Sequence, residues 1–340
     1  MTADPAAPAV LAIETSCDET AVAILRGGEL LASEVASQIA IHAQYGGVVP
    51  EVASRNHLRM LKPVLATALA AAGLRIEDIA AFAATCGPGL ATSLMIGTSA
   101  AKGLAVAMRR PYLAVNHIEG HLLSPFFGSA QGVRPAVALV VSGGHTLLVR
   151  IEAFGKYHLL GQTQDDAAGE AFDKVGKLLG LPYPGGPNVD RIARGGDAAR
   201  HDFPRSMIHS GDFNFSFSGL KTSVRYLLPK LETLHLPDLC ASFQEAVVDV
   251  LVAKTVAAAL ATRTRVVAVS GGVSCNTRLR EKMTDACARR GLELLIAEPG
   301  LCTDNAGMIA YVAAQKLAHG DISPLTADID PNLRLVAGAG

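Results

Sequence analysis

The stretch Ala9-Val-Leu-Ala-Ile-Glu-Thr-Ser-Cys-Asp-Glu-Thr-Ala-Val-Ala-Ile-Leu25 decides the fold. Its two apolar runs, residues 9–13 and 21–25, have the length of buried strands, and the polar segment between them predicts a tight acidic turn. A Gly27-Gly28 turn and a third predicted strand through Val35 follow. The three strands predict a β-meander whose first turn carries carboxylate and hydroxyl groups.

The same pattern restarts in the second half of the chain. The run Ala136-Val-Ala-Leu-Val-Val-Ser-Gly-Gly-His-Thr146 is again an apolar strand that enters a short turn, and residues 147–151 predict the return strand. A meander with an acidic, hydroxyl-rich first turn is typical of an actin-like ATPase domain. We therefore expect the α/β class and a duplicated actin-like ATPase (ASKHA) fold, with ligand and metal in the cleft between two subdomains.

The subdomain boundary is predicted over residues 128–135, where glycine, serine, glutamine and proline concentrate. The apolar segment Met308–Ala318 predicts a helix that packs back on the first half. We expect a disordered leader over 1–8, an N-terminal subdomain over 9–132 joined by a helix at about 305–320, a C-terminal subdomain over 133–304 and a tail over 321–340. Further predicted elements are helices over 52–72 and 89–108, strands over 79–84, 112–115 and 266–270, and a helix from Thr277.

The composition describes a folded globular protein. Half of the 340 residues are hydrophobic, and the net charge of −1 gives no overall basic field that would indicate nucleic acid. The six cysteines form no Cys-x-x-Cys pair, which favours reduced thiols in a cytosolic setting. The first residues lack the basic and apolar segments of a signal peptide, and no apolar run reaches the ~20 residues that span a bilayer. We expect a cytoplasmic protein that makes no membrane contact.

A metal site is predicted from three residues. His117 and His121 lie four residues apart on a predicted helix, so both imidazoles project from one face, and Asp304 from a distant loop would complete two-histidine, one-carboxylate ligation. Glu119 does not adjoin the first histidine, so the His-Glu-x-x-His protease motif does not fit. The alternative is a pair of surface histidines that cap or solvate the helix.

A set of segments, taken together and in order from about residue 9 to about residue 335, resembles the TsaD family of bacterial tRNA N6-adenosine threonylcarbamoyltransferases, formerly described as O-sialoglycoprotein endopeptidases. One departure is Leu147, where a glutamine would be expected. The segments are Ile13-Glu-Thr-Ser-Cys-Asp-Glu-Thr20, Asn116-His-Ile-Glu-Gly-His121, Val141-Ser-Gly-Gly-His-Thr146, Gly169-Glu-Ala-Phe-Asp-Lys174, Tyr183-Pro-Gly-Gly-Pro187, Ser270-Gly-Gly-Val-Ser-Cys-Asn276 and Thr303-Asp304.

The resemblance implies transfer of a threonylcarbamoyl group from threonylcarbamoyl-AMP to N6 of the adenosine 3′ of the anticodon, in tRNAs that read codons starting with A. It also implies one divalent metal per chain, iron in the first place and zinc as the alternative. The rival interpretation from another enzyme class is an actin-like kinase or ATPase, with Mg²⁺ held by Glu14 and its neighbours. A metallopeptidase and a nucleotide-binding scaffold subunit are further alternatives.

The donor of that reaction carries a phosphate, a ribose and an adenine, and the glycine segments suit these groups. Gly143 and Gly144 let backbone N–H groups approach an anion, although an ordinary hairpin turn is the alternative. Asp173 and Asp190 are suited to ribose hydroxyls, and Asn276 to adenine, unless Asp190 is a solvated helix residue and Asn276 a plain helix cap. The full set of expected donor-binding residues is Val140, Val141, Ser142, Gly143, Gly144, Asp173, Gly186, Asp190 and Asn276.

Two charged residues have expected roles beside the donor. Glu14, at the end of the first strand, is the candidate catalytic residue that positions the attacking amine or a water, unless its charge only ties the first turn together. The metal would act as a Lewis acid on the donor. Lys174 offers a countercharge for phosphate, although a lysine at such a position is often only exposed.

The expected partners are tRNA and, by resemblance, two proteins: TsaB, a shorter actin-like paralogue, and TsaE, a P-loop ATPase. The predicted helix after Pro88 is rich in small residues, so another helix could approach it closely. The alternative is that these residues pack against the sheet of their own subdomain. The substitution Gly97→Arg is expected to prevent a partner helix from pairing with this face. Three cationic segments are candidates for tRNA contact or only solvated faces. They are Arg55 with His57, Arg59 and Lys62; Arg109-Arg110; and Arg278-Leu-Arg280.

Overall fold

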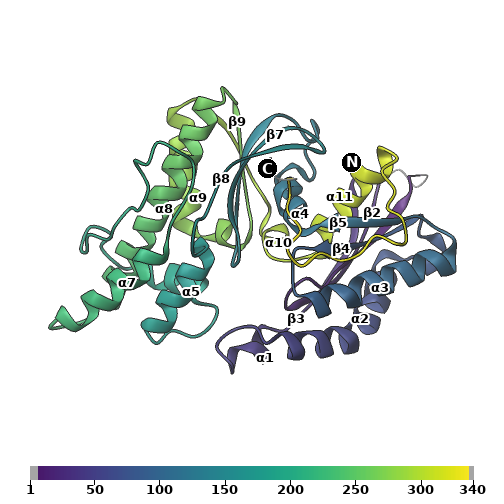
Figure 1. Cartoon of the computed structure of the whole chain (residues 1–340), viewed down its shortest axis with the longest axis horizontal. Coiled ribbons are helices and arrows are strands. Elements are labelled where there is room, and N and C mark those ends of the chain that lie inside the picture. The colour runs from purple at the N-terminus through teal and green to yellow at the C-terminus, as the bar shows by residue number, and fades with distance from the viewer. Residues whose placement is uncertain (1–6, 337–340) are drawn as a thin grey trace. The chain divides into compact units, whose positions relative to one another are not determined.

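The computed structural model describes residues 7–336 and divides the chain into two compact units, each with one five-stranded mixed sheet (Figure 1). Within the described residues, the first unit comprises the chain up to residue 132 and from residue 303, and the second unit comprises Val133–Cys302. Asp304, which we expected at the end of the second subdomain, therefore belongs to the first unit. Residues 1–6 of the expected leader lie outside the described residues.

The first unit is built on the meander that the sequence predicts. Its sheet has the order β3-β2-β1-β4-β5, with β1 to β3 antiparallel and β4 and β5 parallel to β1. All residues of β1 and of β4 are buried, so these two strands form the middle of the unit. The strands are β1 (Ala9–Glu14), β2 (Glu19–Arg26), β3 (Glu29–Ser37), β4 (Ala81–Gly87) and β5 (Tyr112–Asn116).

Helices cover both faces of this sheet. The long helices α2 and α3 lie on one face and α11 on the other (Figure 1), and α11 contacts β1, β2 and β5 of the first unit. The short helix α4 packs against α11. The helices are α1 (Ile39–Ala43), α2 (Pro50–Ala72), α3 (Ala91–Met108), α4 (His117–Leu123) and α11 (Ala306–Ala318), with short 3-10 turns at Ile76–Asp78 and Ser124–Phe126.

The small residues of α3 serve internal packing. A Cβ on Gly97 would lie 2.5 Å from Thr15 Oγ1 and 3.4 Å from Ile13, so Gly97 lets the helix approach β1 closely. Gly97 faces its own sheet and is unsuited to report on a partner, which corrects the choice of this position. The exposed face of α3 carries Met95, Gly103 and Val106 instead.

The second unit repeats the strand path of the first. Its sheet has the order β10-β9-β6-β7-β8, again a meander of three antiparallel strands followed by two strands parallel to the first of them. The two sheets therefore have one topology, as the repeated pattern predicts. The strands are β6 (Ala136–Val141), β7 (Thr146–Ala153), β8 (Lys156–Gln162), β9 (Val266–Ser270) and β10 (Glu293–Ile296).

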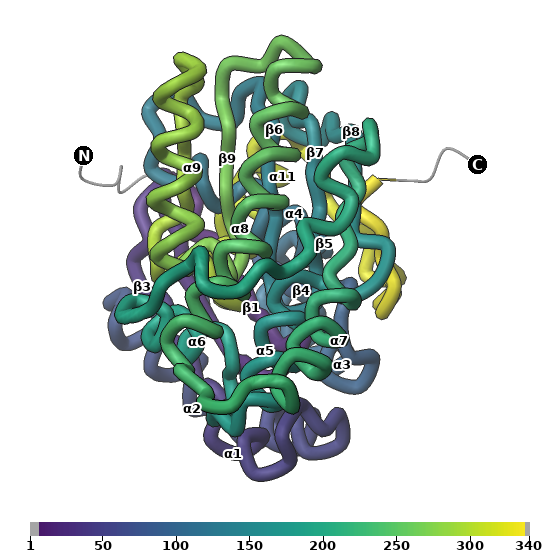
Figure 2. Tube along the Cα trace, turned by 90° about the vertical axis from the view of Figure 1, so that its left-hand side faces the viewer, coloured from purple at the N-terminus to yellow at the C-terminus, as the bar shows by residue number. Residues whose placement is uncertain are grey.

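The helices of the second unit include a long one that the sequence analysis missed. Helix α8 contacts β6, β9 and α6, and it runs beside α9 (Figure 2). Its mixture of apolar and small residues is buried along most of its length. The helices are α5 (Ala168–Leu178), α6 (Gly185–Ala193), α7 (Ser218–Leu227), α8 (Leu236–Ala261), α9 (Thr277–Arg289) and α10 (Pro299–Cys302), with 3-10 turns at Leu228–Lys230 and Gly272–Cys275. Within residues 7–336, no helix has the length and hydropathy needed to cross a membrane.

Candidate functional site: a metal-binding cluster and glycine turns

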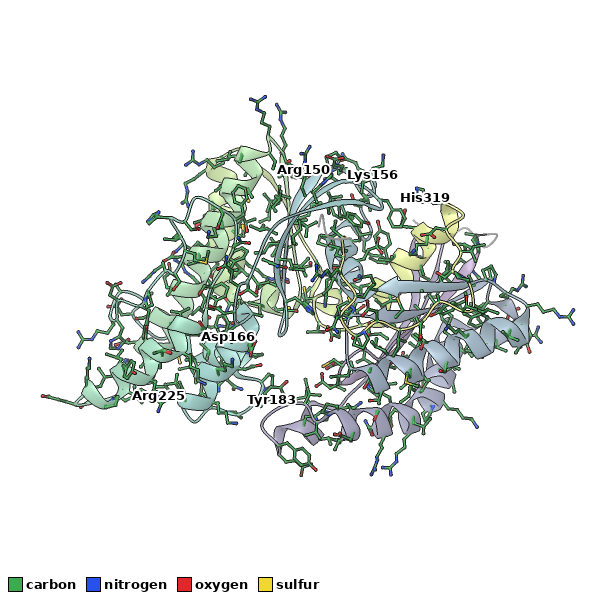
Figure 3. All side chains as sticks on the ribbon, viewed as in Figure 1. Arg150, Lys156, Asp166, Tyr183, Arg225 and His319 are labelled. Atoms are coloured by element: carbon green, nitrogen blue, oxygen red, sulfur yellow. The ribbon has the colours of Figure 1, made fainter. Side chains whose placement is uncertain are left out.

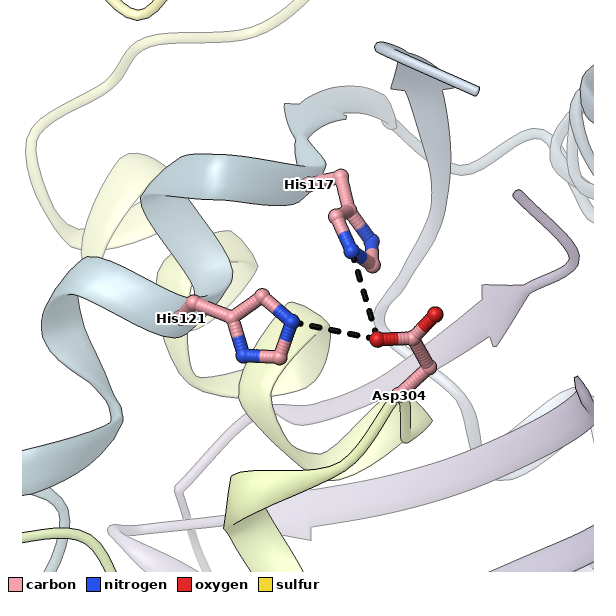
Figure 4. A group of neighbouring side chains, drawn as sticks. All are labelled: His117, His121 and Asp304. Carbon is pink, nitrogen blue, oxygen red and sulfur yellow. Dashed lines mark hydrogen bonds and ion pairs between the residues drawn. The ribbon is translucent and has the colours of Figure 1, made fainter. Parts of the chain in front are cut away.

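The two histidines of the predicted metal site stand on α4, which begins where Asn116 caps it. The Asn116 side chain accepts hydrogen bonds from the backbone N–H groups of Ile118 and Glu119, at 2.8 and 3.3 Å, and so fixes the first turn. His117 is the first residue of the helix and His121 lies one turn later, on the same side. Asp304 precedes α11, and both of its partners come from α4 (Figure 4).

The three side chains, which we call the metal cluster, converge on one point. Asp304 Oδ1 lies 3.1 Å from His121 Nε2 and 3.4 Å from His117 Nε2. Two donors that are each about 2.1 Å from one ion and about 90–110° apart lie roughly 3.0–3.4 Å from one another, so both distances to Asp304 suit a shared ion. The ligand atoms of all three residues lie within 4.8 Å of one another, so the group could hold one metal ion. His117 is 5% exposed and His121 is fully buried, which makes the interpretation as surface histidines wrong.

Glu14 holds His117 from the other side. Its Oε2 atom lies 3.1 Å from His117 Nδ1 and accepts a hydrogen bond from Thr85 Oγ1, and its Oε1 accepts one from the backbone N–H of Ser16. Ser16 Oγ also lies 3.2 Å from the same ring nitrogen. A carboxylate on one nitrogen of a histidine fixes the ring and leaves the other nitrogen for a metal. Neither Ser16 nor Thr85 was predicted as a site residue, although Ser16 lies within the segment Ile13–Thr20 and Thr85 directly follows the predicted strand over 79–84.

The charges of the cluster are strongly coupled. Burial raises the pKa of the carboxylates, but the contacts with His117 outweigh this effect, so the pKa of Glu14 is lowered and that of Asp304 lies well below its usual value. Burial lowers the pKa of His117, yet Asp304 and Glu14 raise it well above the usual histidine value. Burial lowers the pKa of His121. The fully buried Glu14 and the partly buried Asp304 thus favour positive charge between them, which a divalent cation would supply.

The turn after β1 lies in a field of negative charge. Burial, Asp304 and Asp18 raise the pKa of Glu19 to about 9, because another anion is disfavoured at this place. The Cys17 thiol is buried beside the same groups, and its pKa is raised. The field of the first unit therefore favours cations around the metal cluster.

The turn that links β6 to β7 in the second unit has the opposite character. Ser142 closes it, since its N–H donates to the carbonyl of His145 at 2.8 Å and its Oγ accepts from the N–H of His145 at 3.2 Å. Nothing lies within 4 Å of a Cβ placed on Gly143 or Gly144, and neither has a positive φ. No internal packing therefore requires glycine at these two positions. We call residues 142–144 the glycine loop.

Helix α5 begins directly against the glycine loop. A Cβ on Gly169 would lie 2.5 Å from the carbonyl oxygen of Ser142, and the N–H of Ala168 donates to Thr146 Oγ1 at 2.9 Å. Gly271, at φ +89°, approaches the end of β6 in the same way, because its Cβ would lie 2.3 Å from the Val141 carbonyl oxygen. The loop is thus more than a hairpin turn, because a helix N-terminus and a second glycine turn meet its base. Val140 and Val141 are buried strand residues before it.

Asp173 is joined to the Gly185-Gly186 turn. Its Oδ1 accepts the N–H of Gly185 at 2.7 Å, and burial raises the pKa of Asp173 against the lowering effect of the Gly185 and Gly186 N–H groups. A Cβ on Gly185 would clash with the Phe172 carbonyl oxygen at 2.7 Å, whereas one on Gly186 would meet only Phe172 Cβ, at 3.8 Å. Gly185 is therefore the glycine that packing demands, and Gly186 is free to face a ligand.

Asp190 and Asn276 meet at the start of α9. Asp190 accepts hydrogen bonds from the N–H and the Oγ1 of Thr277, at 3.2 and 3.0 Å, and is 8% exposed, so it is no solvated helix residue. Asn276 caps α9 through Leu279 N–H at 2.9 Å and donates to Gln244 Oε1 at 2.7 Å, so the capping alternative is correct. A hollow of about 280 Å³ opens beside them; its lining includes Asp190, Arg194, Gln244, Thr277 and Arg278.

Several predicted cations have internal partners. Lys174 pairs with Asp166 at 2.7 Å and Glu170 at 2.8 Å, which leaves it no open charge for phosphate. His57 is fully buried between Thr20 Oγ1 and the carbonyl of Cys17, and burial lowers its pKa, so it adds no surface charge. The remaining segments pair in part, since Arg278 joins Glu245 and Arg280 bonds the Ser274 carbonyl.

Comparison with known proteins agrees with this arrangement. Residues 29–311 match the family model described as TsaD, tRNA N6-adenosine threonylcarbamoyltransferase. The chain belongs to the TsaD family. A relative of the same name from Geobacter sp. (strain M21) is 52% identical over 95% of both chains, and one from Kosmotoga olearia is 48% identical over 96% of this chain and 99% of its own. The predicted assignment to this enzyme family is confirmed.

Solved structures agree with the predicted duplicated actin-like fold. Full-length HypF in a phosphate- and nucleotide-bound form is 12% identical with a TM-score of 0.62, and covers 93% of this chain and 56% of its own. The activator of 2-hydroxyisocaproyl-CoA dehydratase from Clostridium difficile is 15% identical with a TM-score of 0.51, over 94% of this chain and 100% of its own. At such identities the likeness concerns the fold alone, and the fold class is confirmed.

Proposed function

We propose that the protein transfers the threonylcarbamoyl group from threonylcarbamoyl-AMP to N6 of the adenosine 3′ of the anticodon, in tRNAs that read codons starting with A. The single observation that carries the proposal is the buried metal cluster, whose carboxylate and two histidines converge beside Glu14. A kinase of this fold has no need of such a cluster. In the reaction the N6 nitrogen attacks the carbamoyl carbon, AMP leaves, and a proton leaves N6.

His117, His121 and Asp304 would hold one divalent ion, iron in the first place and zinc as the alternative, since two imidazoles and a carboxylate suit both. When bound, the ion supplies Lewis-acid stabilisation for charge that develops on the donor. Glu14 acts as a positioning residue, because its carboxylate lies on His117 Nδ1 and sets the direction of Nε2. This role differs from the expected contact with the attacking amine.

The glycine loop would receive an anionic part of the donor. Gly143 and Gly144 leave room for close approach to the backbone, and the N-terminal end of α5 lies at the base of the loop. Gly186 offers similar room beside Asp173, whose second oxygen is suited to a ribose hydroxyl. The hollow beside Asp190 and Gln244 is the place for the remaining nucleoside, with Asn276 shaping its wall through Gln244.

The test is direct. The chain, supplied with metal, threonylcarbamoyl-AMP, unmodified tRNA and the two expected protein partners, should convert the adenosine to its threonylcarbamoyl derivative, which nucleoside mass analysis detects. A tRNA with another base at this position should remain unmodified. Hydrolysis of ATP by the chain alone, without any transfer to tRNA, would favour the kinase or ATPase alternative.

The partner proposal concerns the outer face of α3. Met95 and Val106 are 54% and 59% exposed, and nothing lies within 4 Å of a Cβ placed on Gly103, which stands between them in the sequence. Proteins like TsaB and TsaE are the proposed partners, and this face is suited to a helix of the former. Gly103→Arg should abolish pairing and turnover while metal content stays normal. Ala66→Arg, at an exposed position of α2, adds the same charge and is the matched control. Full multiple turnover by the chain alone would contradict the proposal.

A further inference from the structure

The second unit gathers arginines at the edge of its sheet that lies opposite the glycine loop. Strands β6 and β9 both begin at this edge, and β7 ends there because it runs antiparallel to β6. A hollow of about 370 Å³ opens at the edge, and its lining includes Pro135, Arg150, Arg263 and Arg265. Arg150 lies far in the sequence from Arg263 and Arg265, and the sequence analysis did not single out any of the three. We call Arg150, Arg263 and Arg265 the arginine edge.

Most of the positive charge of the arginine edge is not neutralised by ion pairs within the described residues. Arg263 and Arg265 are exposed, and neither forms an ion pair or a side-chain hydrogen bond with any residue from 7 to 336. Arg150 shares Glu152 with His158, at 3.4 and 3.3 Å, in pairs that are about half exposed and thus weak. Glu152 is the one acidic residue among those that line the hollow, against three arginines, and such an excess of positive charge concentrates anions.

Further arginines extend the positive region. Arg289 and Arg290 end α9, just before β10, whose first residue pairs with Val266 and donates its N–H to the carbonyl of Arg265. That first residue, Glu293, is already paired with Arg134. The chain has a net charge of only −1, so this edge stands out against a nearly neutral whole.

The geometry points to the arginine edge as a docking surface for backbone phosphates of the substrate RNA, in the stem that carries the modified loop; this inference rests on the proposed function. Guanidinium groups bind phosphate oxygens in a bidentate way, which suits them to this role. Sequence-independent contacts of this kind position an RNA and give much of its affinity.

The distance between the edge and the glycine loop fits such a stem. Ser142 follows Pro135 by seven residue steps of extended chain, which places the two ends of the strand roughly 23 Å apart at about 3.3 Å per residue. At roughly 3.4 Å per nucleotide along a strand, this spans about seven nucleotides. An RNA whose target base is at the donor would therefore reach the arginine edge with phosphates of its adjoining stem.

The test compares two triple variants with the same change of charge in the same unit. The first is Arg150→Gln, Arg263→Gln and Arg265→Gln together. The control is Lys221→Gln, Arg225→Gln and Lys230→Gln on α7 and the turn after it. Figure 3 shows Arg225 at the lower left and Arg150 at the top of this unit. The probe is a fluorescent full-length tRNA, titrated with the full chain over a series of salt concentrations.

We expect the edge variant to bind tRNA at least about tenfold more weakly at moderate salt, with a salt slope smaller by about 2, since each lost phosphate contact removes about 0.7–0.9. The control should differ little from wild type. In the transfer assay the edge variant should show a raised KM for tRNA and an unchanged kcat. Equal affinities and salt slopes for both triple variants would overturn the inference.

Two further readouts separate this inference from the proposed function and from a small-molecule site. If wild type transfers nothing to tRNA but the binding difference between the triple variants stands, only the proposed function fails. Inorganic pyrophosphate serves as the free-phosphate probe. If pyrophosphate raises the Tm of wild type and not of the edge variant, while both bind tRNA equally, the edge serves a small phosphate compound and the RNA inference falls.

Discussion

The turns after β1 and after β6 occupy equivalent positions in two sheets of the same topology, yet they differ in charge and in burial. The turn after β1 is acidic: Glu14 is fully buried, and Glu19 has its pKa raised to about 9 by burial and neighbouring acids. The turn after β6 presents Gly143 and Gly144, both exposed and free of side chains. One unit is thus prepared for a cation and the other for an anion.

The comparison shows how a repeated fold acquires two chemistries. The backbone path is kept because the apolar strands β1 and β6 require the same burial, while the turn residues face no such constraint. Carboxylates at one turn concentrate positive charge, and bare N–H groups at the other receive negative charge. The predictions below ask whether each turn can be disabled without the other.

The largest effect is expected for Asp304→Ala. The substitution removes the oxygen that faces both histidines, so we expect the rate of transfer to fall by about 10²–10³, the scale on which loss of one electrostatic stabiliser acts. The steady-state rate of threonylcarbamoyl transfer measures this. Asp328→Ala, an exposed carboxylate of the same unit, is the control and should retain full activity. An active Asp304→Ala enzyme would remove the metal cluster from the mechanism.

The next effect is expected for Glu14→Gln. The amide keeps the shape but loses the charge on His117 Nδ1, and loss of such a partner lowers metal affinity about 10–100-fold. Competition with a chelator of known affinity measures the change. Affinity for AMP, which concerns the other turn, should stay as in wild type. Unchanged metal affinity would mean that Glu14 only ties its own turn together.

A pair of glycine variants sharpens the contrast within the second unit. Gly143→Val should weaken AMP binding with little loss of Tm, because its side chain enters open space. Gly271→Ala should lower stability by about 1–3 kcal/mol, because φ is +89° and the new Cβ meets the Val141 carbonyl. Calorimetry and thermal unfolding measure the two effects. The same loss of Tm in both variants would show that the glycine loop is a structural turn.

The smallest effect is expected in the stability of the fold at acidic pH, and it involves neither of the two turns. Hydrogen bonds from Arg278 and, to a smaller extent, from Lys282 lower the pKa of Glu245 to about 2, because together they outweigh the raising effect of burial. A carboxylate with a lowered folded-state pKa stabilises the fold above its unfolded value of about 4.5, and this contribution is lost as pH falls from there to about 2. Glu245→Gln should therefore flatten the fall of Tm over that pH range. An unaltered Tm profile would show that solvent screens these pairs.

The sequence predicted the first meander, the repeat and the metal cluster because each depends on local spacing. Strand length fixes β1 and β6, and the four-residue interval fixes the side on which His117 and His121 lie. The sequence analysis did not predict α8, because the apolar residues of this helix are buried on nearly all sides and show no clear helical period. The burial of His57 and the inward direction of Gly97 also depend on which helix face meets the sheet.

The candidate donor residues show the same limit. Asp173 was expected to bind ribose hydroxyls, but it already accepts the N–H of Gly185, so its removal would also leave a buried donor unpaired. Asn276 was left between two roles, and only the contacts with Leu279 and Gln244 decide for the helix cap. The arginine edge joins two distant segments, the end of β7 and the loop before β9, and no spacing in the sequence reveals it.

The most direct test of the central claim is the metal content of three purified proteins, measured by plasma mass spectrometry: wild type, Asp304→Ala and Gly143→Val. The account predicts close to one equivalent of iron or zinc per chain in wild type and in Gly143→Val, and almost none in Asp304→Ala. Equal metal in all three proteins, or loss of metal in Gly143→Val alone, would contradict the division of the two turns into a cation site and an anion site.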